Sequence, residues 1–518
     1  MSPVLKAVIN CGSSSIRMII CEFDSDGRPQ VIDQAIQYLP MGRDVFTTGQ
    51  ISNKTMTRAM EILKLYRELL NGYGIDLKDV EVIGTAAVRE ATNRENFADR
   101  IEIRTGFSIR FIDGLEENRL SYMAILYALG SDVGMLSKGN TLIMEVSGGA
   151  TEVILLRKGI IGSVHSLSFG AIRFQEMFRQ KKGFVEVKSH ELEQNISSLR
   201  ELIHEDCKSR NINRVFLLGN YARIAAEMIG KTTNPKLIEV NHEAWNRLAE
   251  ELYHLPPEEI VKRYGVAAAA ADGMGTALLA YRYLLKEIDC ETILVPKVGI
   301  SEGLVMESRP GIDPDVQAKF WNQVKNSAIA LGKKYDFDLE HARVVASLSM
   351  QLFDQLVHEH RMTKRQRLLL EIAAFLHDIG TYVKPSAHHK HGQYLVENSE
   401  IFGLGSHDLK VIGNVVRYHR KSTPQNTHLG FVSLSREDRL TVMKMAAILR
   451  IADALDRSHS QKVKELKINI TEDTVELLVN CDEDLGAEKL SLSDKGTFFE
   501  DVFGYSLKLI QTKKGASN

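Results

Sequence analysis

Two stretches with the same order of residue types decide the fold. The segment VINCGSSSIRMII (residues 8–20) is an apolar run, a Gly/Ser turn and a second apolar run. The segment IMEVSGGATEVIL (residues 143–155) repeats this order, with Asn10 aligned on Glu145 and Gly12 on Ser147. Apolar runs on both sides of a small-residue turn are typical of a β-hairpin. The sequence therefore predicts two matching hairpins.

The tips of these hairpins are candidate phosphate sites. Small residues leave backbone N–H groups without side-chain cover, so a turn of this kind can form a nest for phosphate oxygens. A tight turn with no ligand is an equally good explanation of either tip alone, but the duplication favours function. The candidate phosphate-binding residues of the tips are Gly12, Ser13, Ser14, Ser15, Gly148 and Gly149.

The remaining periodicity predicts an α/β protein followed by a helical part and a small β-rich end. Helical spacing covers 54–73, 96–104, 342–357 and 364–375, and strand patterns cover 80–83, 215–218, 466–470 and 475–479. Residues 308–314 have the composition of a linker, and 513–518 are expected to fray. The predicted domains are 1–125, 126–307, 315–458 and 459–518.

Composition excludes several classes of protein. A chain of 518 residues needs more than one core, and its 65 Lys and Arg balance 67 Asp and Glu. We therefore expect neither a nucleic-acid coat nor a membrane-surface binder. Five scattered cysteines without a CxxC pair favour a reducing compartment. Because no long apolar run stands out, we expect a cytoplasmic protein without a membrane partner.

Five motifs in order resemble those of the exopolyphosphatase and guanosine-pentaphosphatase family, within the acetate kinase, Hsp70 and actin superfamily. They are NCGSSSIR (10–17), GTAAVR (84–89), DGLEENRL (113–120), SFGAIR (168–173) and GISEG (299–303). The resemblance implies two ribonuclease-H-like, actin-like lobes, 1–125 and 126–307, with a cleft between them. It also implies release of terminal orthophosphate from polyphosphate or guanosine pentaphosphate with Mg²⁺ or Mn²⁺, and a homodimer.

The resemblance assigns roles to individual residues. Glu117 takes the position of the catalytic base, where a carboxylate accepts the proton of an attacking water. Glu152 corresponds to an acidic residue that helps to hold metal or that water. Arg89 corresponds to a basic residue of the phosphate channel, where a guanidinium suits phosphate oxygens. The implied metal ligands of this cleft are Asn10, Glu145 and Glu152.

Departures from the family pattern leave other functions open. Asn10 replaces the usual Asp, and Glu145 stands where the second loop usually has Asp, which predicts a weaker or displaced metal site. Acetate kinases also open with N-x-G-S-S-S, so an acetate-kinase-like phosphotransferase is one alternative, and a catalytically weakened polyphosphate or alarmone sensor is another. The segments 84–89 and 114–120 and the helical region favour the phosphatase. Tyr221 and Arg223 make a usually small turn bulky and disfavour nucleotide binding there.

The helical region contains a second set of candidate ligands. His341, His377, Asp378 and Asp453 resemble the H…HD…D signature of HD-domain metal phosphohydrolases, with His388, His389, His391 and His419 nearby in sequence. Imidazoles and carboxylates of this kind hold divalent ions that activate water. We therefore expect an all-α HD-like domain with a possible second divalent metal site, or a silent scaffold that keeps these residues. The pair His407 and Asp408 is interpreted as a chance match.

Overall fold

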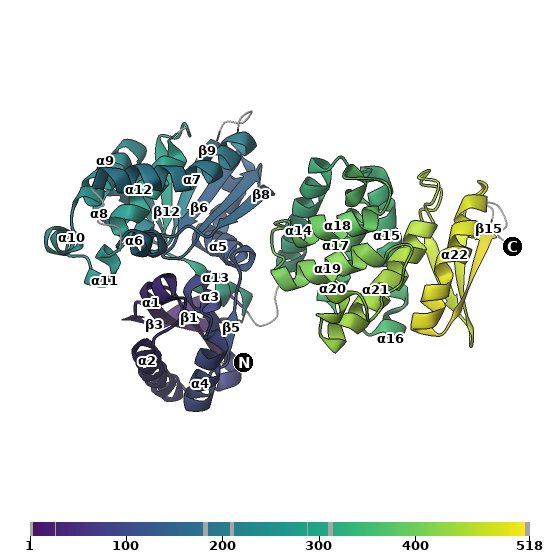
Figure 1. The fold of residues 1–518 in the computed structure, drawn as a ribbon, viewed down its shortest axis with the longest axis horizontal. Coiled ribbons are helices and arrows are strands. Elements are labelled where there is room, and N and C mark those ends of the chain that lie inside the picture. The colour runs from purple at the N-terminus through teal and green to yellow at the C-terminus, as the bar shows by residue number, and fades with distance from the viewer. Residues whose placement is uncertain are drawn as a thin grey trace. The chain divides into compact units, whose positions relative to one another are not determined.

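The computed structural model describes residues 4–25, 27–179, 185–207, 212–286, 288–308 and 314–512. They belong to two compact units, Met1–Ala318 and Lys319–Asn518. The first unit is mixed α/β with two sheets, and the second is helical with a three-stranded sheet near the C-terminus (Figure 1).

The first sheet has the strand order β3-β2-β1-β4-β5. Strands β1, β2 and β3 are antiparallel neighbours, and β4 and β5 continue the sheet in parallel with β1. The first hairpin and the elements predicted at 54–73, 80–83 and 96–104 are confirmed. The elements of this part are β1 (Val4–Cys11), β2 (Ser15–Phe23), β3 (Pro29–Tyr38), α1 (Met41–Thr48), α2 (Asn53–Gly72), β4 (Val80–Gly84), α3 (Ala86–Glu90), α4 (Arg94–Thr105), β5 (Ile109–Phe111) and α5 (Gly114–Leu129).

The second sheet repeats this plan in β8-β7-β6-β9-β12 and extends it by β11 and β10. The hairpin of β6 and β7 and the strand predicted at 215–218 are confirmed. The elements are β6 (Asn140–Val146), β7 (Thr151–Arg157), β8 (Ile160–Leu167), α6 (Ala171–Arg179), α7 (Val185–Cys207), β9 (Ile212–Leu218), α8 (Asn220–Ile229), β10 (Lys231–Asn234), β11 (Leu237–Asn241), α9 (His242–His254), α10 (Pro257–Tyr264), α11 (Ala268–Ala271), α12 (Met274–Leu285), β12 (Thr292–Pro296) and α13 (Ile300–Glu307).

Two helices join the halves of this unit across the predicted boundary at 125. Helix α5 runs through that boundary and packs on β7 and β8. Helix α13 returns to the first half, where Ile300 and Leu304 share a buried cluster with Val8 and Ile19. Each of these two helices therefore packs on the sheet of the other predicted lobe.

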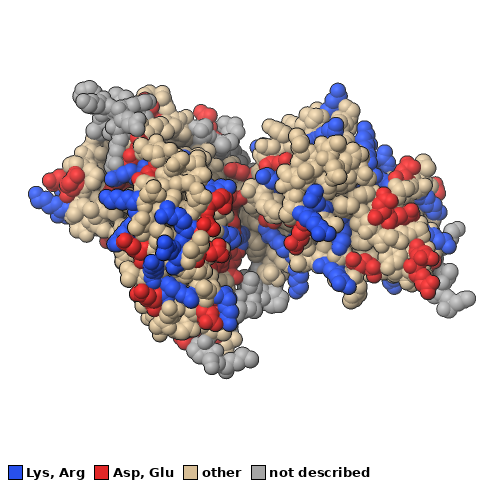
Figure 2. Space-filling view, turned by 60° about the horizontal axis from the view of Figure 1, so that its bottom comes forward, with Lys and Arg blue, Asp and Glu red and all other residues tan. Residues whose placement is uncertain are grey.

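Helix α5 with the turn that follows it (Gly114–Ser137) is long and apolar enough, by length and composition, to cross a membrane. Half of this apolar window is buried inside the fold, as in a core helix of a globular protein. Over the face seen in Figure 2, Lys and Arg are interspersed with Asp and Glu, which agrees with the balanced composition.

The second unit contains the helices and strands predicted for the C-terminal part. Helices at 342–357 and 364–375 and strands at 466–470 and 475–479 are confirmed within three residues. Most of the predicted linker and the predicted frayed tail lie outside the described residues. The elements are α14 (Pro314–Lys334), α15 (Leu339–Gln355), α16 (Val357–His360), α17 (Lys364–Leu376), α18 (His388–Glu397), α19 (Ser406–Tyr418), α20 (Leu429–Val432), α21 (Arg436–Ala454), β13 (Leu466–Ile470), β14 (Thr474–Asn480), α22 (Gly486–Phe503) and β15 (Ser506–Thr512).

Candidate functional site

A cavity of about 350 Å³ lies in the first unit, where the tips of the two hairpins face each other. Its walls come from both halves and include the turn after β9 and the start of α13. Glu152, Arg89 and Gly149 are not among the residues that line it. The predicted residues that line the cavity are Asn10, Gly12, Ser13, Ser14, Ser15, Glu117, Glu145 and Gly148.

The two tips are closed in the same way. Gly12 N–H donates to Ser15 O at 2.9 Å, and Ser147 N–H donates to Ala150 O at 2.9 Å, so the aligned residues make equivalent bonds. Within the described part of the chain, the N–H groups of Ser13, Ser14 and Gly148 have no hydrogen-bond acceptor. Free amides at two facing turns provide the donors that a phosphate oxygen requires.

Close packing explains the glycines of the second tip. A Cβ atom on Gly148 would lie 3.0 Å from Ser13 Cβ, and one on Gly149 would lie 2.7 Å from Phe46 Cζ. The start of α6 supports this tip, because Ala171 N–H donates to Ser147 O at 2.9 Å. The segment 168–173 therefore fixes the second tip against the first.

Glu117 is positioned by the first turn of α5. The N-cap Asp113 accepts a hydrogen bond from Glu116 N–H, which fixes the start of the helix. Glu117 is 2% exposed, and Arg89 donates to its Oε1 at 2.7 Å and to Ile112 O at 2.5 Å. Burial raises the pKa of Glu117 above its ordinary value, although the Arg89 guanidinium opposes this. The result is a buried carboxylate of increased basicity beside the cavity.

Two further carboxylates lie opposite each other on the second hairpin. Glu145 pairs with Glu152 across β6 and β7, and both are buried. Ser121 Oγ donates to Glu145 at 2.9 Å, and Asn118 Nδ2 donates to Glu152 at 2.7 Å. Burial raises the pKa of Glu145 to about 7, and burial together with the nearby Glu117 raises the pKa of Glu152 well above its ordinary value. Helix α5 therefore holds all three carboxylates.

Asn10 supplies an oxygen that fits a metal ion. Its side chain lines the cavity, and its Oδ1 atom is buried without a hydrogen-bond partner among the described residues. Glu145 lines the same cavity and adds a carboxylate. Amide and carboxylate oxygens are the donors that a hard cation such as Mg²⁺ prefers, so the residues fit the implied ion.

Sequence reasoning missed the cations of the cavity wall. Arg17 donates to Glu302 at 2.6 Å and to Gln34 at 3.1 Å, and Lys297 and Arg223 also line the cavity. The signal for the first pair was available, because Arg17 ends the first motif and Glu302 lies in the last. Tyr221 is 5% exposed and donates to Asp272 O at 3.3 Å, so it is largely a core residue.

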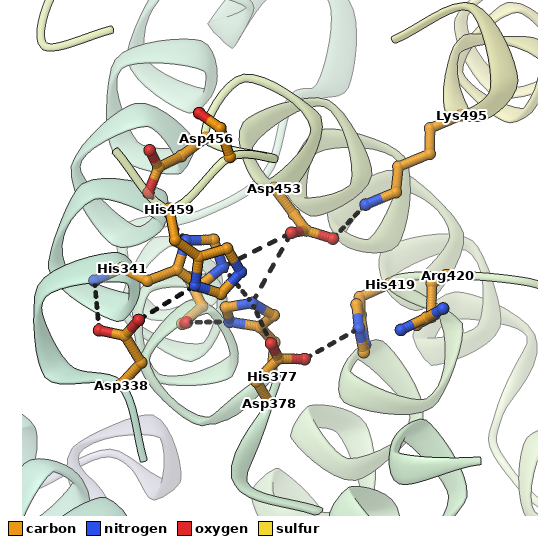
Figure 3. A network of polar contacts seen from close by, with 12 residues as sticks. Asp338, His341, His377, Asp378, His419, Arg420, Asp453, Asp456, His459 and Lys495 are labelled. Atoms are coloured by element: carbon orange, nitrogen blue, oxygen red, sulfur yellow. Dashed lines mark hydrogen bonds and ion pairs between the residues drawn. The ribbon is translucent and has the colours of Figure 1, made fainter. Parts of the chain in front are cut away.

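The second unit brings its four predicted ligands together (Figure 3). His341 Nε2 lies 3.2 Å from His377 Nε2 and 3.6 Å from Asp453 Oδ1, and His377 Nε2 lies 3.8 Å from Asp378 Oδ2. Burial lowers the pKa of His377 to about 4. Burial alone would raise the pKa of Asp453, but Lys495 and the imidazoles outweigh it and hold that pKa well below the ordinary value.

Other members of this cluster were not assigned from the sequence. His388 Nε2 lies 3.1 Å from Asp378 Oδ1, and His419 Nε2 lies 3.5 Å from the same oxygen. Asp456 accepts from His341 Nδ1 at 2.8 Å, and Lys495 pairs with Asp453. Only the sequence proximity of His388 and His419 pointed to them. His407 is exposed and pairs with Asp438 instead.

Comparison with known proteins identifies relatives of this chain. Its sequence matches the Ppx/GppA phosphatase family over residues 19–311 and domain III of the Ppx/GppA phosphatases over 324–495. The guanosine-5'-triphosphate,3'-diphosphate pyrophosphatase of Aeromonas hydrophila is 23% identical over 487 residues, which cover 91% of this chain and 92% of the relative. The enzyme of that name from Vibrio parahaemolyticus is 24% identical over 461 residues, with 86% and 87% covered.

A solved structure shares the fold of the first unit. The exopolyphosphatase from Cytophaga hutchinsonii superimposes with a TM-score of 0.54 at 20% identity, covering 60% of this chain and 99% of that one. The family match extends over more than half of the chain and includes the part of the cavity lining that follows the first hairpin tip. The chain therefore belongs to the Ppx/GppA phosphatase family.

Proposed function

We propose that the first unit hydrolyses the terminal phosphoanhydride of inorganic polyphosphate or guanosine pentaphosphate and releases orthophosphate. The observation that carries this proposal is Glu117, a buried glutamate whose pKa is raised, in the wall of a cavity between two turns with free N–H groups. The names of the relatives from Aeromonas and Vibrio and of the Cytophaga structure support this substrate class.

Each residue of the cavity has its own role in the proposed reaction. The N–H groups of Ser13, Ser14 and Gly148 bind phosphate oxygens, and Arg17 and Lys297 offset the charge of the chain. Glu117 accepts the proton of the attacking water while Arg89 holds its carboxylate in place. Arg89 thus acts through Glu117 in this arrangement.

A divalent ion is part of the proposal. Asn10 and Glu145 line the cavity and would hold Mg²⁺ or Mn²⁺, with Glu152 behind them. When bound, such an ion neutralises phosphate oxygens in the transition state. The crowding of Glu117, Glu145 and Glu152 in a buried space favours a cation there.

The proposal also covers the fold type of each unit, the cellular location and the oligomeric state. The shared strand order of the two sheets supports ribonuclease-H-like lobes, and the cluster of His341, His377, Asp378 and Asp453 supports an HD-like second unit. A cytoplasmic location and a homodimer rest on the scattered cysteines and on the resemblance to the family, respectively.

The test is phosphate release by the full chain from long polyphosphate, guanosine pentaphosphate and ATP, with Mg²⁺ or Mn²⁺. We expect Glu117→Gln to lower release by at least ~100-fold, the usual scale for a lost general base. Glu116→Gln is the matched control, because Glu116 precedes it on α5 and pairs with Arg110 and Arg119. Near-normal turnover of Glu117→Gln would contradict the assignment. Phosphorylation of ADP would instead favour the kinase, and tight binding without turnover in the wild type would favour the sensor.

A further inference from the structure

Arg89, which holds the carboxylate of Glu117, lies beside a second glutamate. Its Nη1 donates to Glu117 Oε1 at 2.7 Å, and its Nη2 lies 3.8 Å from Oε1 of the neighbouring Glu90. Glu117 is buried, whereas the Glu90 side chain is 33% exposed. One guanidinium therefore has two carboxylates within reach, and of the two contacts only that with Glu117 has the length of a hydrogen bond.

Arg173 of α6 occupies the carboxylate of Glu90. Its Nη2 donates to Oε1 at 2.8 Å and to Oε2 at 2.7 Å, so both oxygens of Glu90 accept from the same guanidinium. The Arg173 side chain is 20% exposed, and its guanidinium lies over the Phe46 ring at 4.2 Å from the centroid. Because partial burial and the aromatic ring restrict this side chain, its ion pair is stronger than one between freely moving surface residues.

The same guanidinium is bonded to the second hairpin tip. Arg173 Nε donates to Gly149 O at 2.9 Å, and Arg173 N–H donates to Gly148 O at 3.0 Å. Arg173 belongs to the second half of the unit, whereas Arg89 and Glu90 of α3 belong to the first. A continuous series of contacts therefore runs from the second tip through Glu90 and Arg89 to the proposed general base.

Glu90 would compete for Arg89 if its own partner were absent. Opposite charges attract more strongly as they approach, and rotation of the partly exposed Glu90 side chain can shorten the 3.8 Å contact. Burial disfavours the ionised form of Glu117 and raises its pKa, so Glu117 is the weaker competitor for a cation. A guanidinium drawn to Glu90 would leave Glu117 without the donor that fixes its carboxylate.

We propose that Arg173 is a positioning residue, which occupies Glu90 and so keeps Arg89 on the general base. This role rests on the proposed function, in which Glu117 accepts the proton of the attacking water. Arg173 touches neither that water nor the phosphate, and it acts on the base through two ion pairs. Because Arg173 and Glu90 come from different halves of the unit, the base has its working geometry only while the second tip lies against the first half.

The test is steady-state phosphate release by the full chain from long polyphosphate and from guanosine pentaphosphate with Mg²⁺. In Arg173→Met we expect kcat to fall about tenfold or more, because a small displacement of a catalytic group is costly, while KM changes by less than about threefold. Glu90→Gln removes the competing carboxylate, so in that background Arg173→Met should lower kcat by less than about threefold. Arg58→Met is the matched control, because Arg58 pairs with Glu61 on the exposed face of α2.

A crystal structure of Arg173→Met gives a measurement that does not depend on activity. We expect the Arg89 guanidinium to lie within hydrogen-bond distance of Glu90 and to have left Glu117. Arg173→Lys is a second variant that keeps a cation beside Glu90. Its kcat should fall less than that of Arg173→Met, which separates the role of the charge from a folding defect of the methionine variant.

The outcomes distinguish this role from the proposed function. An Arg89 that stays on Glu117 in the variant structure would overturn the role of Arg173, and so would a fall in kcat that Glu90→Gln does not reverse. A rise in KM alone would also overturn it, because Arg173 would then only support the second tip. Wild-type protein that releases no phosphate from either substrate would instead contradict the proposed function, and the variant structure would still decide the placement of Arg89.

Discussion

Replacing Glu145 with glutamine should make the first unit more stable in a strictly pH-dependent way. Burial raises the pKa of Glu145 from 4.5 to about 7, so the folded chain binds this proton more tightly than the unfolded chain does. Stability is then lost as the pH rises from the unfolded to the folded pKa, and the loss is complete above the folded pKa. A tenfold change in proton affinity corresponds to about 1.4 kcal/mol, so the full penalty is about 3 kcal/mol.

The glutamine variant removes this penalty and keeps the local geometry. Ser121 Oγ donates to Glu145 at 2.9 Å, and an amide oxygen accepts the same bond. We therefore expect Glu145→Gln to match the wild type at about pH 4, below the unfolded pKa, and to exceed its stability by about 3 kcal/mol at about pH 8, without divalent metal. Magnesium favours the ionised carboxylate, so its addition should reduce the difference at the higher pH.

The chain allows this measurement to be confined to the first unit. Of its two tryptophans, Trp245 is fully buried in the first unit and packs edge-on against Tyr281. The Tyr281 hydroxyl accepts a hydrogen bond from the N–H of Val146, the residue after Glu145. In a Trp321→Phe background, urea unfolding followed by fluorescence reports this unit alone. Glu61→Gln, at an exposed surface position, is the control. An equal stability difference at both pH values, or none at either, would refute the reasoning.

Two further predictions concern the metal sites. Asn10→Asp adds a carboxylate where a buried amide oxygen now lacks a partner. This variant should lower the Mg²⁺ concentration for half-maximal phosphate release by roughly tenfold, or about 1.4 kcal/mol. An unchanged Mg²⁺ titration would mean that residue 10 does not touch the ion. Lys495→Met removes the cation paired with Asp453, so Mn²⁺ should bind the second unit more tightly. The affinity is measured by calorimetric titration of protein that also carries Glu117→Gln. Equal or weaker binding would show that Lys495 supports the site.

The fold was predictable where a local pattern determines it. The aligned segments at 8–20 and 143–155 predict two hairpins, and both tips are closed by the same bond from the first turn residue to the fourth. The long helix at 54–73 follows from its spacing, because residues such as Ala59, Leu63 and Tyr66 are buried on one face. Local pattern was sufficient because the helix has one buried face and the strands of the second hairpin are continuous buried runs on either side of a small-residue turn.

The contacts between distant segments were not predictable in this way. Glu302 reaches Arg17 across 285 positions of the chain, and Asp456 reaches His341 across 115. Neither residue follows from a spacing, because its partner is set by packing of helices from other parts of the chain. The predicted boundary at 125 falls within α5, which packs on β7 and β8 while its Leu120 shares a buried cluster with Val8 and Ile19.

The two hairpins are alike in backbone and opposite in charge. At equivalent positions, Asn10 pairs with Arg17 in the first, and Glu145 pairs with Glu152 in the second. The first hairpin thus contributes an amide and a guanidinium beside three buried carboxylates, of which only Glu117 has a direct arginine partner among the described residues. An aspartate at position 10 would add a fourth carboxyl group to this cluster. The asparagine therefore favours the folded state without metal, and the same neutrality weakens the attraction for the ion that the carboxylates require.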